Sequence, residues 1–160
     1  MSEINRRSLM MGFAIAGIAA PIPTKATAAT MAIYKDPNCG CCSGWVEHVQ
    51  AAGFETQINE LADLGPVKLR LAIPPALSSC HTAEIEGYVI EGHVPATAIR
   101  RLLIERPTAT GLAVAGMPVG SPGMEVPGTA DEPYNVILFG PSGQRTYTSF
   151  KGTREIGPQP

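Results

Sequence analysis

The chain has 160 residues, with 12 basic and 14 acidic side chains and a net charge of −2 at pH 7. This balance gives no sign of a nucleic acid as partner, because phosphate backbones are bound mainly through clustered Lys and Arg. Beyond residue 28, no stretch is long and apolar enough to span a membrane. Residues 29–152 are enough for one domain that buries a core without help from disulfides.

The first 28 residues have the organisation of an export signal. Arg6 and Arg7 form a positive start, residues 9–20 are largely apolar, and Ala-Thr-Ala at 26–28 resembles a cleavage site. The paired arginines fit the twin-arginine route, although ordinary secretory signals also contain adjacent arginines. The apolar run is shorter than the roughly 20 residues that cross a bilayer. We therefore expect residues 1–28 to be absent from the mature protein.

The remaining elements, taken in chain order, alternate between strands and helices. Hydrophobic spacing and turn residues predict strands over 32–35, 54–61, 87–90 and 112–115, helices over 43–52, 66–72 and 95–106, and a terminal hairpin over 135–139 and 144–150. Loops are expected over 76–83 and 119–133, and a flexible tail over 153–160. This order indicates an α/β layer architecture and matches the thioredoxin-like fold. That fold has a proline, usually cis, before its third core strand, which Pro95 or Pro118 could supply.

The densest chemistry lies in the segment Cys39-Gly40-Cys41-Cys42, between the first predicted strand and helix. Cys39 and Cys42 have C-x-x-C spacing, which suits thiol–disulfide exchange as well as metal binding. The start of a helix stabilises thiolates, which are both nucleophiles and ligands for soft metals. A simple oxidoreductase needs two cysteines, whereas a soft metal gains from a third sulfur. We therefore favour metal binding over pure thiol redox chemistry, and expect the thiols to be too crowded for ordinary disulfides.

Further candidate ligands lie later in the chain. Cys80 and His81 are adjacent in a predicted loop and would add a fourth sulfur and an imidazole if that loop folds over the cysteines. His93 is a weaker candidate, because a turn histidine commonly bonds the backbone instead. His48 is expected to face solvent from the first helix.

Two methionines lie in a Gly- and Pro-rich stretch that cannot form a regular helix or strand. Met117 and Met124 are therefore not ordinary members of an apolar core stripe. The thioether sulfur is a neutral, soft ligand suited to Cu(I), although methionine also fills gaps beneath loops. We expect one of them to contribute at the rim of a metal site.

These motifs together resemble the CopG-like copper-resistance proteins of the bacterial periplasm. The resemblance runs over most of residues 32–152 and depends on the segments 36–42, 79–83, 87–96, 116–118 and 120–124. It implies a thioredoxin-like fold, a periplasmic location, and a role in copper tolerance. It also implies a copper site, able to hold more than one ion, at Cys39, Cys41, Cys42 and Cys80. Copper ions and other periplasmic copper-handling proteins would be its partners.

Three functions remain open from the sequence. The chain could hold or hand on Cu(I), or it could be an enzyme that uses the site for copper oxidation or for disulfide exchange through Cys39 and Cys42. It could also be a binding module built around structural zinc, since zinc accepts four cysteines or three cysteines and a histidine.

Overall fold

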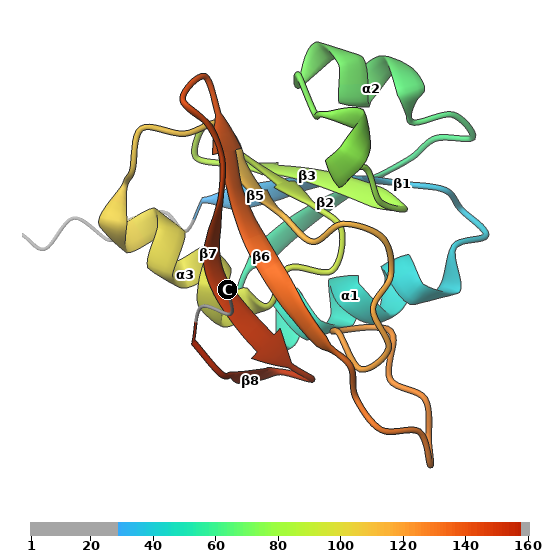
Figure 1. Ribbon diagram of the computed structural model, residues 1–160. Helices are drawn as coiled ribbons and strands as arrows, with labels where there is room; N and C mark the ends of the chain where they lie inside the picture. Colours follow the sequence, from blue (N-terminus) through green and yellow to red (C-terminus); the bar gives the residue numbers. More distant parts are fainter. Residues whose placement is uncertain (1–28, 158–160) are drawn as a thin grey trace, which may run out of the picture.

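The structure, a computed structural model, describes residues 29–157, and the expected export signal at residues 1–28 lies outside them (Figure 1). The described chain is a mixed α/β protein. Its strands are β1 (Thr30–Lys35), β2 (Glu55–Glu60), β3 (His81–Ile85), β4 (Tyr88–Glu91), β5 (Gly111–Ala113), β6 (Pro133–Gly140), β7 (Gly143–Lys151) and β8 (Arg154–Glu155). Its helices are α1 (Gly40–Ala51), α2 (Gly65–Arg70), the 3-10 helix η1 (Pro75–Leu77) and α3 (Ala96–Glu105).

All eight strands join one sheet in the order β2-β1-β3-β4-β5-β6-β7-β8. The pairs β1–β2 and β4–β5 are parallel, and all other neighbours are antiparallel. Each parallel pair is joined through a helix, α1 in the first case and α3 in the second, because parallel strands need a long crossover. The α/β class predicted from the alternating elements is confirmed.

The sheet separates two apolar cores. Helices α1 and α3 cover one face and α2 lies across the sheet from them (Figure 1). Trp45 of α1 and Ile90 of β4 belong to the larger core, whereas Val89 packs with Leu77 in the smaller one. Ile90 and Val89 fall in different cores because successive residues of a strand point to opposite faces. No described helix has the length and apolar character of a membrane span.

Three expectations about local structure were wrong. His81 does not lie in a loop but begins β3, and the loop expected at 76–83 also contains η1. Pro95 directly precedes α3 and Pro118 lies in the connection between β5 and β6, so neither directly precedes a strand, and residues 29–157 contain no cis peptide bond. Within the stretch expected as a tail, Arg154 and Glu155 form β8, which pairs with β7.

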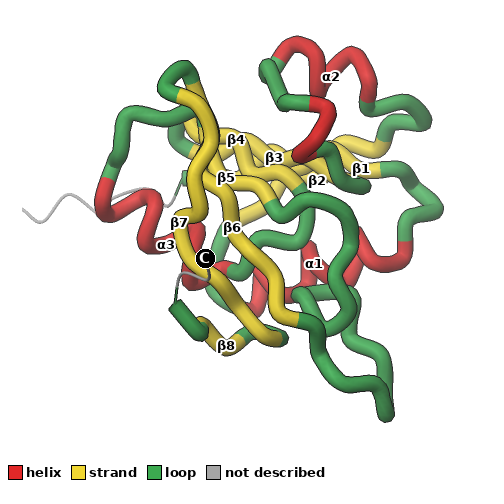
Figure 2. The backbone as a smooth tube through the Cα atoms, in the orientation of Figure 1, coloured by secondary structure: helices red, strands yellow, loops and turns green. Residues whose placement is uncertain are grey.

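A long connection between β5 and β6 lies beside α1 (Figure 2). It comes so close that an added Cβ atom on Gly44 of α1 would lie 2.9 Å from the Cα atom of Gly123. The connection therefore covers the start of α1, where the cysteines lie.

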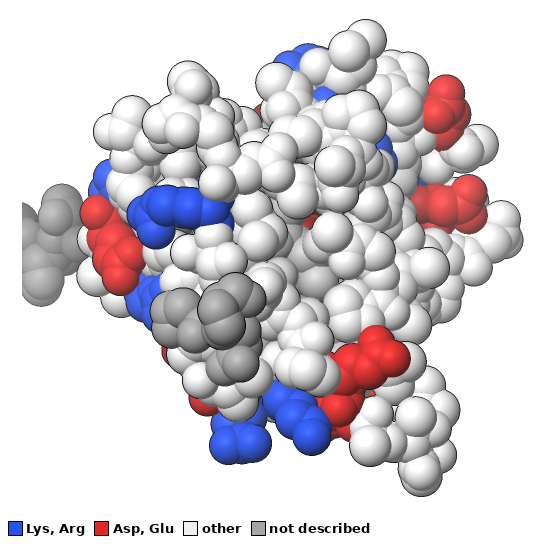
Figure 3. All heavy atoms as spheres, in the orientation of Figure 1, with Lys and Arg blue, Asp and Glu red and all other residues white. Residues whose placement is uncertain are grey.

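On the face shown in Figure 3, basic and acidic side chains are scattered among uncharged ones.

Candidate metal centre

The cysteine motif is held by a turn that leads directly into α1. The Oδ1 atom of Asp36 accepts the Asn38 N–H at 2.7 Å, and the Cys39 N–H donates to the carbonyl oxygen of Asp36 at 3.1 Å. Cys39 is the N-cap residue, and Cys41 and Cys42 lie in the first turn of the helix. The first amides of a helix have no partner within it, so this end of α1 favours negatively charged sulfur.

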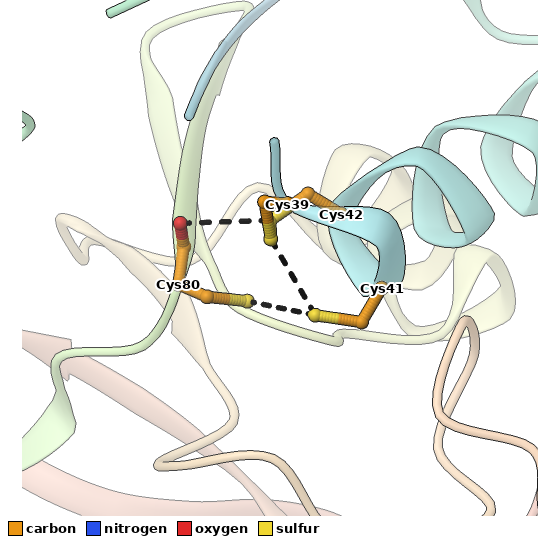
Figure 4. A group of neighbouring side chains, drawn as sticks. All are labelled: Cys39, Cys41, Cys42 and Cys80. Carbon is orange, nitrogen blue, oxygen red and sulfur yellow. Dashed lines mark hydrogen bonds between the residues drawn. A yellow bond between two sulfur atoms is a disulfide. The ribbon is translucent and has the colours of Figure 1, made fainter. Parts of the chain in front are cut away.

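The sheet brings the fourth cysteine to the same place. Antiparallel pairing aligns Lys35, at the end of β1, with His81, at the start of β3. Cys80 therefore comes beside the turn that follows β1, and its side chain points toward Cys41 (Figure 4). The Sγ atoms of Cys41 and Cys80 are 3.7 Å apart. The sequence prediction that Cys80 joins the cluster agrees with this geometry.

The four sulfurs form one compact group. The Sγ atoms of Cys39 and Cys41 are 3.5 Å apart, and that of Cys42 lies 3.6 Å from the carbonyl oxygen of Cys80. All four potential ligand atoms fall within 4.8 Å of one another. Such spacing lets one soft ion, or several ions bridged by sulfur, contact every cysteine.

A disulfide joins Cys39 to Cys42, whereas Cys41 and Cys80 are free thiols. The expectation that the cluster is too crowded for an ordinary disulfide was therefore wrong. The reason is local: residues three apart across the first turn of a helix bring their side chains together. In this form only two of the four sulfurs can become thiolates, so a four-thiolate site requires reduction of the disulfide.

The free Cys80 thiol is held in its neutral form. Burial, reinforced by the neighbouring Cys41, raises the pKa of Cys80 to about 12. A bound cation reverses this preference, because a metal ion supplies the positive charge that stabilises a thiolate. The position therefore suits a thiol that ionises only when a metal ion arrives.

Two buried histidines adjoin Cys80. The Nε2 atom of His93 lies 3.1 Å, and the Nδ1 atom of His81 lies 3.4 Å, from its sulfur. Burial is the main cause that lowers the pKa of both rings, so both are neutral and can offer a lone pair. The Nε2 atom of His81 has no hydrogen-bond partner within the described chain, and its ring packs against Trp45 at a centroid distance of 4.4 Å.

His93 was left out of the ligand set expected from the sequence, although it now stands beside Cys80 and His81 in a second group of potential ligands. The available signal was its place directly after a turn glycine at the end of a predicted strand. His48 was also misjudged, because its Nε2 atom does not face solvent but accepts the Ala96 N–H at 3.1 Å.

The methionines occupy different settings. Gly123 packs against the first turn of α1: a Cβ atom added to it would lie 2.4 Å from the carbonyl oxygen of Cys41. Met124 follows Gly123 directly, so its backbone lies near the first turn of α1. Met117 has a side chain that is 52% exposed. Of the two, Met124 is better placed to act at the rim of the site.

Comparison with known proteins places this site in a family. A family model described as "Protein of unknown function, DUF411" matches residues 77–124. Two solved structures, titled "Copper resistance protein copG", Form 2 and Form 1, align in that order with 41% sequence identity and a TM-score of 0.72 each. The alignments cover 78% and 79% of this chain and 99% and 100% of those chains. The chain belongs to the CopG family of copper resistance proteins. No curated protein matches it.

The resemblance to CopG-like proteins inferred from the motifs is thus confirmed. The DUF411 match spans Cys80, His81, His93 and both methionines of the Gly- and Pro-rich loop, and it begins after the cysteine motif of α1. The candidate metal centre of this CopG-family protein therefore combines that matched segment with an earlier turn, and only the fold brings the two together.

Proposed function

We propose that this protein binds Cu(I) through Cys39, Cys41, Cys42 and Cys80 and acts in copper tolerance. The observation that carries the proposal is the convergence of four sulfurs within 4.8 Å. Cu(I) is a soft ion that prefers thiolate ligands, and a helix start favours the negative charge that they bring. The solved relatives are titled copper resistance proteins, which supports the same function here.

Binding is linked to the redox state of the cluster. Exchange with an external dithiol, which is itself oxidised to a disulfide, transfers two electrons and two protons to the Cys39–Cys42 disulfide and yields two further thiols, which lose protons as copper binds. Four thiolates can bridge more than one Cu(I). His81 and His93 would add nitrogen ligands on the inner side, and Met117 or Met124 a thioether at the rim.

The proposal includes a periplasmic location and a thioredoxin-like core. Residues 1–28 have the order of an export signal, which supports delivery across the inner membrane. The core has a parallel β1–β2 pair, antiparallel β3 and β4, and cysteines at the start of the first helix, which supports the relation to thioredoxin. Other periplasmic copper-handling proteins would deliver or accept the metal.

One observation favours a second candidate function. The Cys39–Cys42 disulfide lies at a helix N-terminus, where C-x-x-C pairs exchange disulfides with other thiols. A thiol–disulfide oxidoreductase would need only this pair, and Cys41 and Cys80 would then be dispensable. Structural zinc is the third candidate, since the same ligand types accept it.

A Cys41→Ser substitution separates these functions. We expect the reduced parent protein to bind Cu(I) more tightly than Zn(II), and Cys41→Ser to lower copper stoichiometry and copper tolerance while retaining the Cys39–Cys42 pair. Metal analysis with thiol counting after Cu(I) titration, in competition with Zn(II), measures this. Unchanged copper binding with fast disulfide exchange would replace the copper assignment by the redox one. Preferential Zn(II) binding would support a structural zinc site.

A further inference from the structure

A buried ion pair lies behind the segment that carries Cys80. Glu91, the last residue of β4, has a fully buried side chain, and Lys68 of α2 reaches it with a side chain that is 16% exposed. The carboxylate of Glu91 accepts hydrogen bonds from the Lys68 ammonium, the Thr82 hydroxyl at 2.6 Å and the backbone N–H of Ser79 at 2.6 Å. The carboxylate therefore joins α2 and β3 to the segment before Cys80.

Ser79 is fixed from several directions. Besides its N–H bond to Glu91, its hydroxyl donates to the carbonyl oxygen of Gly116 at 2.6 Å. Gly92 has φ +69°, and a Cβ atom added there would lie 2.6 Å from the Cβ atom of Ser79. Because Ser79 directly precedes Cys80, this restraint limits where the Cys80 sulfur can lie. That sulfur lies 3.7 Å from the Sγ atom of Cys41 and 3.1 Å from the Nε2 atom of His93.

Stability alone gives a weak reason for such a pair. Removing two charges from water costs much of what their attraction returns, and well-packed apolar replacements are often as stable. A charged acceptor does, however, bind a backbone N–H more strongly than a neutral one. The bond to Ser79 is therefore the feature that an apolar pair would not reproduce.

We propose that Glu91 is a positioning residue that holds Cys80 against the cysteine cluster. The proposal rests on the proposed function only in treating Cys80 as a metal ligand, and the position of Cys80 can be measured without metal. Glu91 itself contacts Ser79 and Thr82, and acts on the site through the backbone of residues 79 and 80.

Two double variants test whether the oxygen that accepts the Ser79 N–H is what positions Cys80. Lys68→Met/Glu91→Met and Lys68→Met/Glu91→Gln both remove the ion pair, but only the second keeps an oxygen for the Ser79 N–H. Both are made in a Cys39→Ser/Cys42→Ser background, where Cys41 and Cys80 are the only cysteines. The metal-free protein is equilibrated with reduced and oxidised glutathione, quenched and analysed by mass spectrometry. The effective concentration of the Cys41–Cys80 pair measures how well Cys80 is positioned.

We expect the Met/Met variant to lower that effective concentration at least about tenfold, and the Met/Gln variant to stay within about threefold of its background protein. Equal values in the two variants would overturn the proposal, as would failure of Cys41 and Cys80 to pair in the background protein. In a Cys41→Ser/Cys80→Ser background, the Cys39–Cys42 pair should change by less than about threefold, because both cysteines lie at the start of α1 and Cys42 meets residue 80 through its carbonyl oxygen. This result would show that the substitutions at Lys68 and Glu91 do not disturb the whole fold.

A matched control and a copper measurement complete the test. Arg70 and Glu84 form another ion pair between α2 and the sheet, with an N–O distance of 2.8 Å, but neither contacts Ser79. Arg70→Met/Glu84→Met should leave the Cys41–Cys80 pair unchanged. With all four cysteines present, Met/Met should bind Cu(I) more weakly than Met/Gln. If the parent protein does not bind Cu(I) while the thiol difference persists, the proposed function fails and the positioning role stands.

Discussion

The Nε2 atom of His93 lies 3.1 Å from the Sγ atom of Cys80, while Nδ1 of the same ring lies 2.8 Å from the carbonyl oxygen of Pro122. A carbonyl oxygen only accepts hydrogen bonds, so Nδ1 carries the proton and Nε2 presents its lone pair to the sulfur. Histidines that bind metals have this arrangement, with the second nitrogen bonded to a carbonyl or carboxylate. The ring is thus oriented for a metal bound at Cys80.

His93→Gln should therefore weaken copper binding by about 10- to 100-fold, the range typical of lost interactions around a metal. Competition with a Cu(I) chelator, on the reduced protein, gives the affinity. His48→Gln is the control, because His48 contacts Ala96 and no cluster cysteine. An unchanged affinity in a folded His93→Gln protein would remove His93 from the site.

The two methionines should differ in their effect. Met124→Leu is expected to lower Cu(I) affinity several-fold, because Met124 directly follows Gly123, which packs on the first turn of α1. Met117→Leu should change it less, since the Met117 side chain is 52% exposed. Leucine preserves most of the volume, so the free energy of unfolding should fall by less than about 1.5 kcal/mol in each case. Equal affinities for both variants and the parent would show that sulfur at these positions does not bind copper.

Features that depend on neighbouring residues could be predicted from the sequence. Pro95 and the apolar residues after it predicted the helix that became α3, and the alternation around Ile58 predicted β2. The cysteine cluster could be placed at a helix start because Asp36 and its neighbours form a turn just before it. Strand and helix periods act over a few residues, so one sequence is enough to show them.

Features that depend on distant pairing could not be predicted. A loop was expected over 76–83, but residues 81–84 pair with β1, and this pairing makes His81 the start of a strand. The approach of His93 to Cys80 needs the β3–β4 register, and its bond to Pro122 needs the long connection after β5. The charges of Lys68 and Glu91 are spaced 23 residues apart, which gives no sequence signal that they meet.

His48 should make stability depend on pH. It accepts the N–H of Ala96, the first residue of α3, and burial lowers its pKa below the ordinary value, although the charge of Glu125 acts in the opposite direction. A protonated ring cannot accept this bond. Because the folded pKa is the lower one, the stabilisation is complete above the unfolded value of about 6.5 and is lost as pH falls through the folded pKa.

Urea unfolding of the metal-free protein at pH 7.5 and pH 5.0 checks this. His48→Gln keeps an acceptor that does not titrate, so its free energy of unfolding should fall less between the two pH values than that of the parent. At pH 7.5 the variant should lose no more than about 1.5 kcal/mol, the value of one hydrogen bond. His81 and His93 titrate in both proteins, so their contribution cancels. An equal loss of unfolding free energy in both proteins would contradict the prediction that a neutral His48 stabilises the fold by accepting the Ala96 N–H.

Gly123 and Gly128 provide a matched pair of substitutions in the connection between β5 and β6. Both have a positive φ, +85° at Gly123 and +79° at Gly128, so alanine at either position costs about 1 kcal/mol of backbone strain. An added Cβ atom at Gly128 meets nothing within 4 Å. At Gly123 it would lie 2.6 Å from the backbone nitrogen of Trp45 and 2.4 Å from the carbonyl oxygen of Cys41. Only Gly123→Ala must therefore move the loop away from α1.

We expect Gly128→Ala to lower the free energy of unfolding by about 1 kcal/mol and to leave Cu(I) affinity unchanged. Gly123→Ala should lower it by about 2–4 kcal/mol, because the clash adds to the strain. It should also weaken Cu(I) binding at least several-fold, since a displaced Pro122 no longer orients His93. Urea unfolding and Cu(I) competition on both variants measure the two effects. If Gly123→Ala loses stability but keeps the parent's copper affinity, the loop covers the site without orienting any of its ligands.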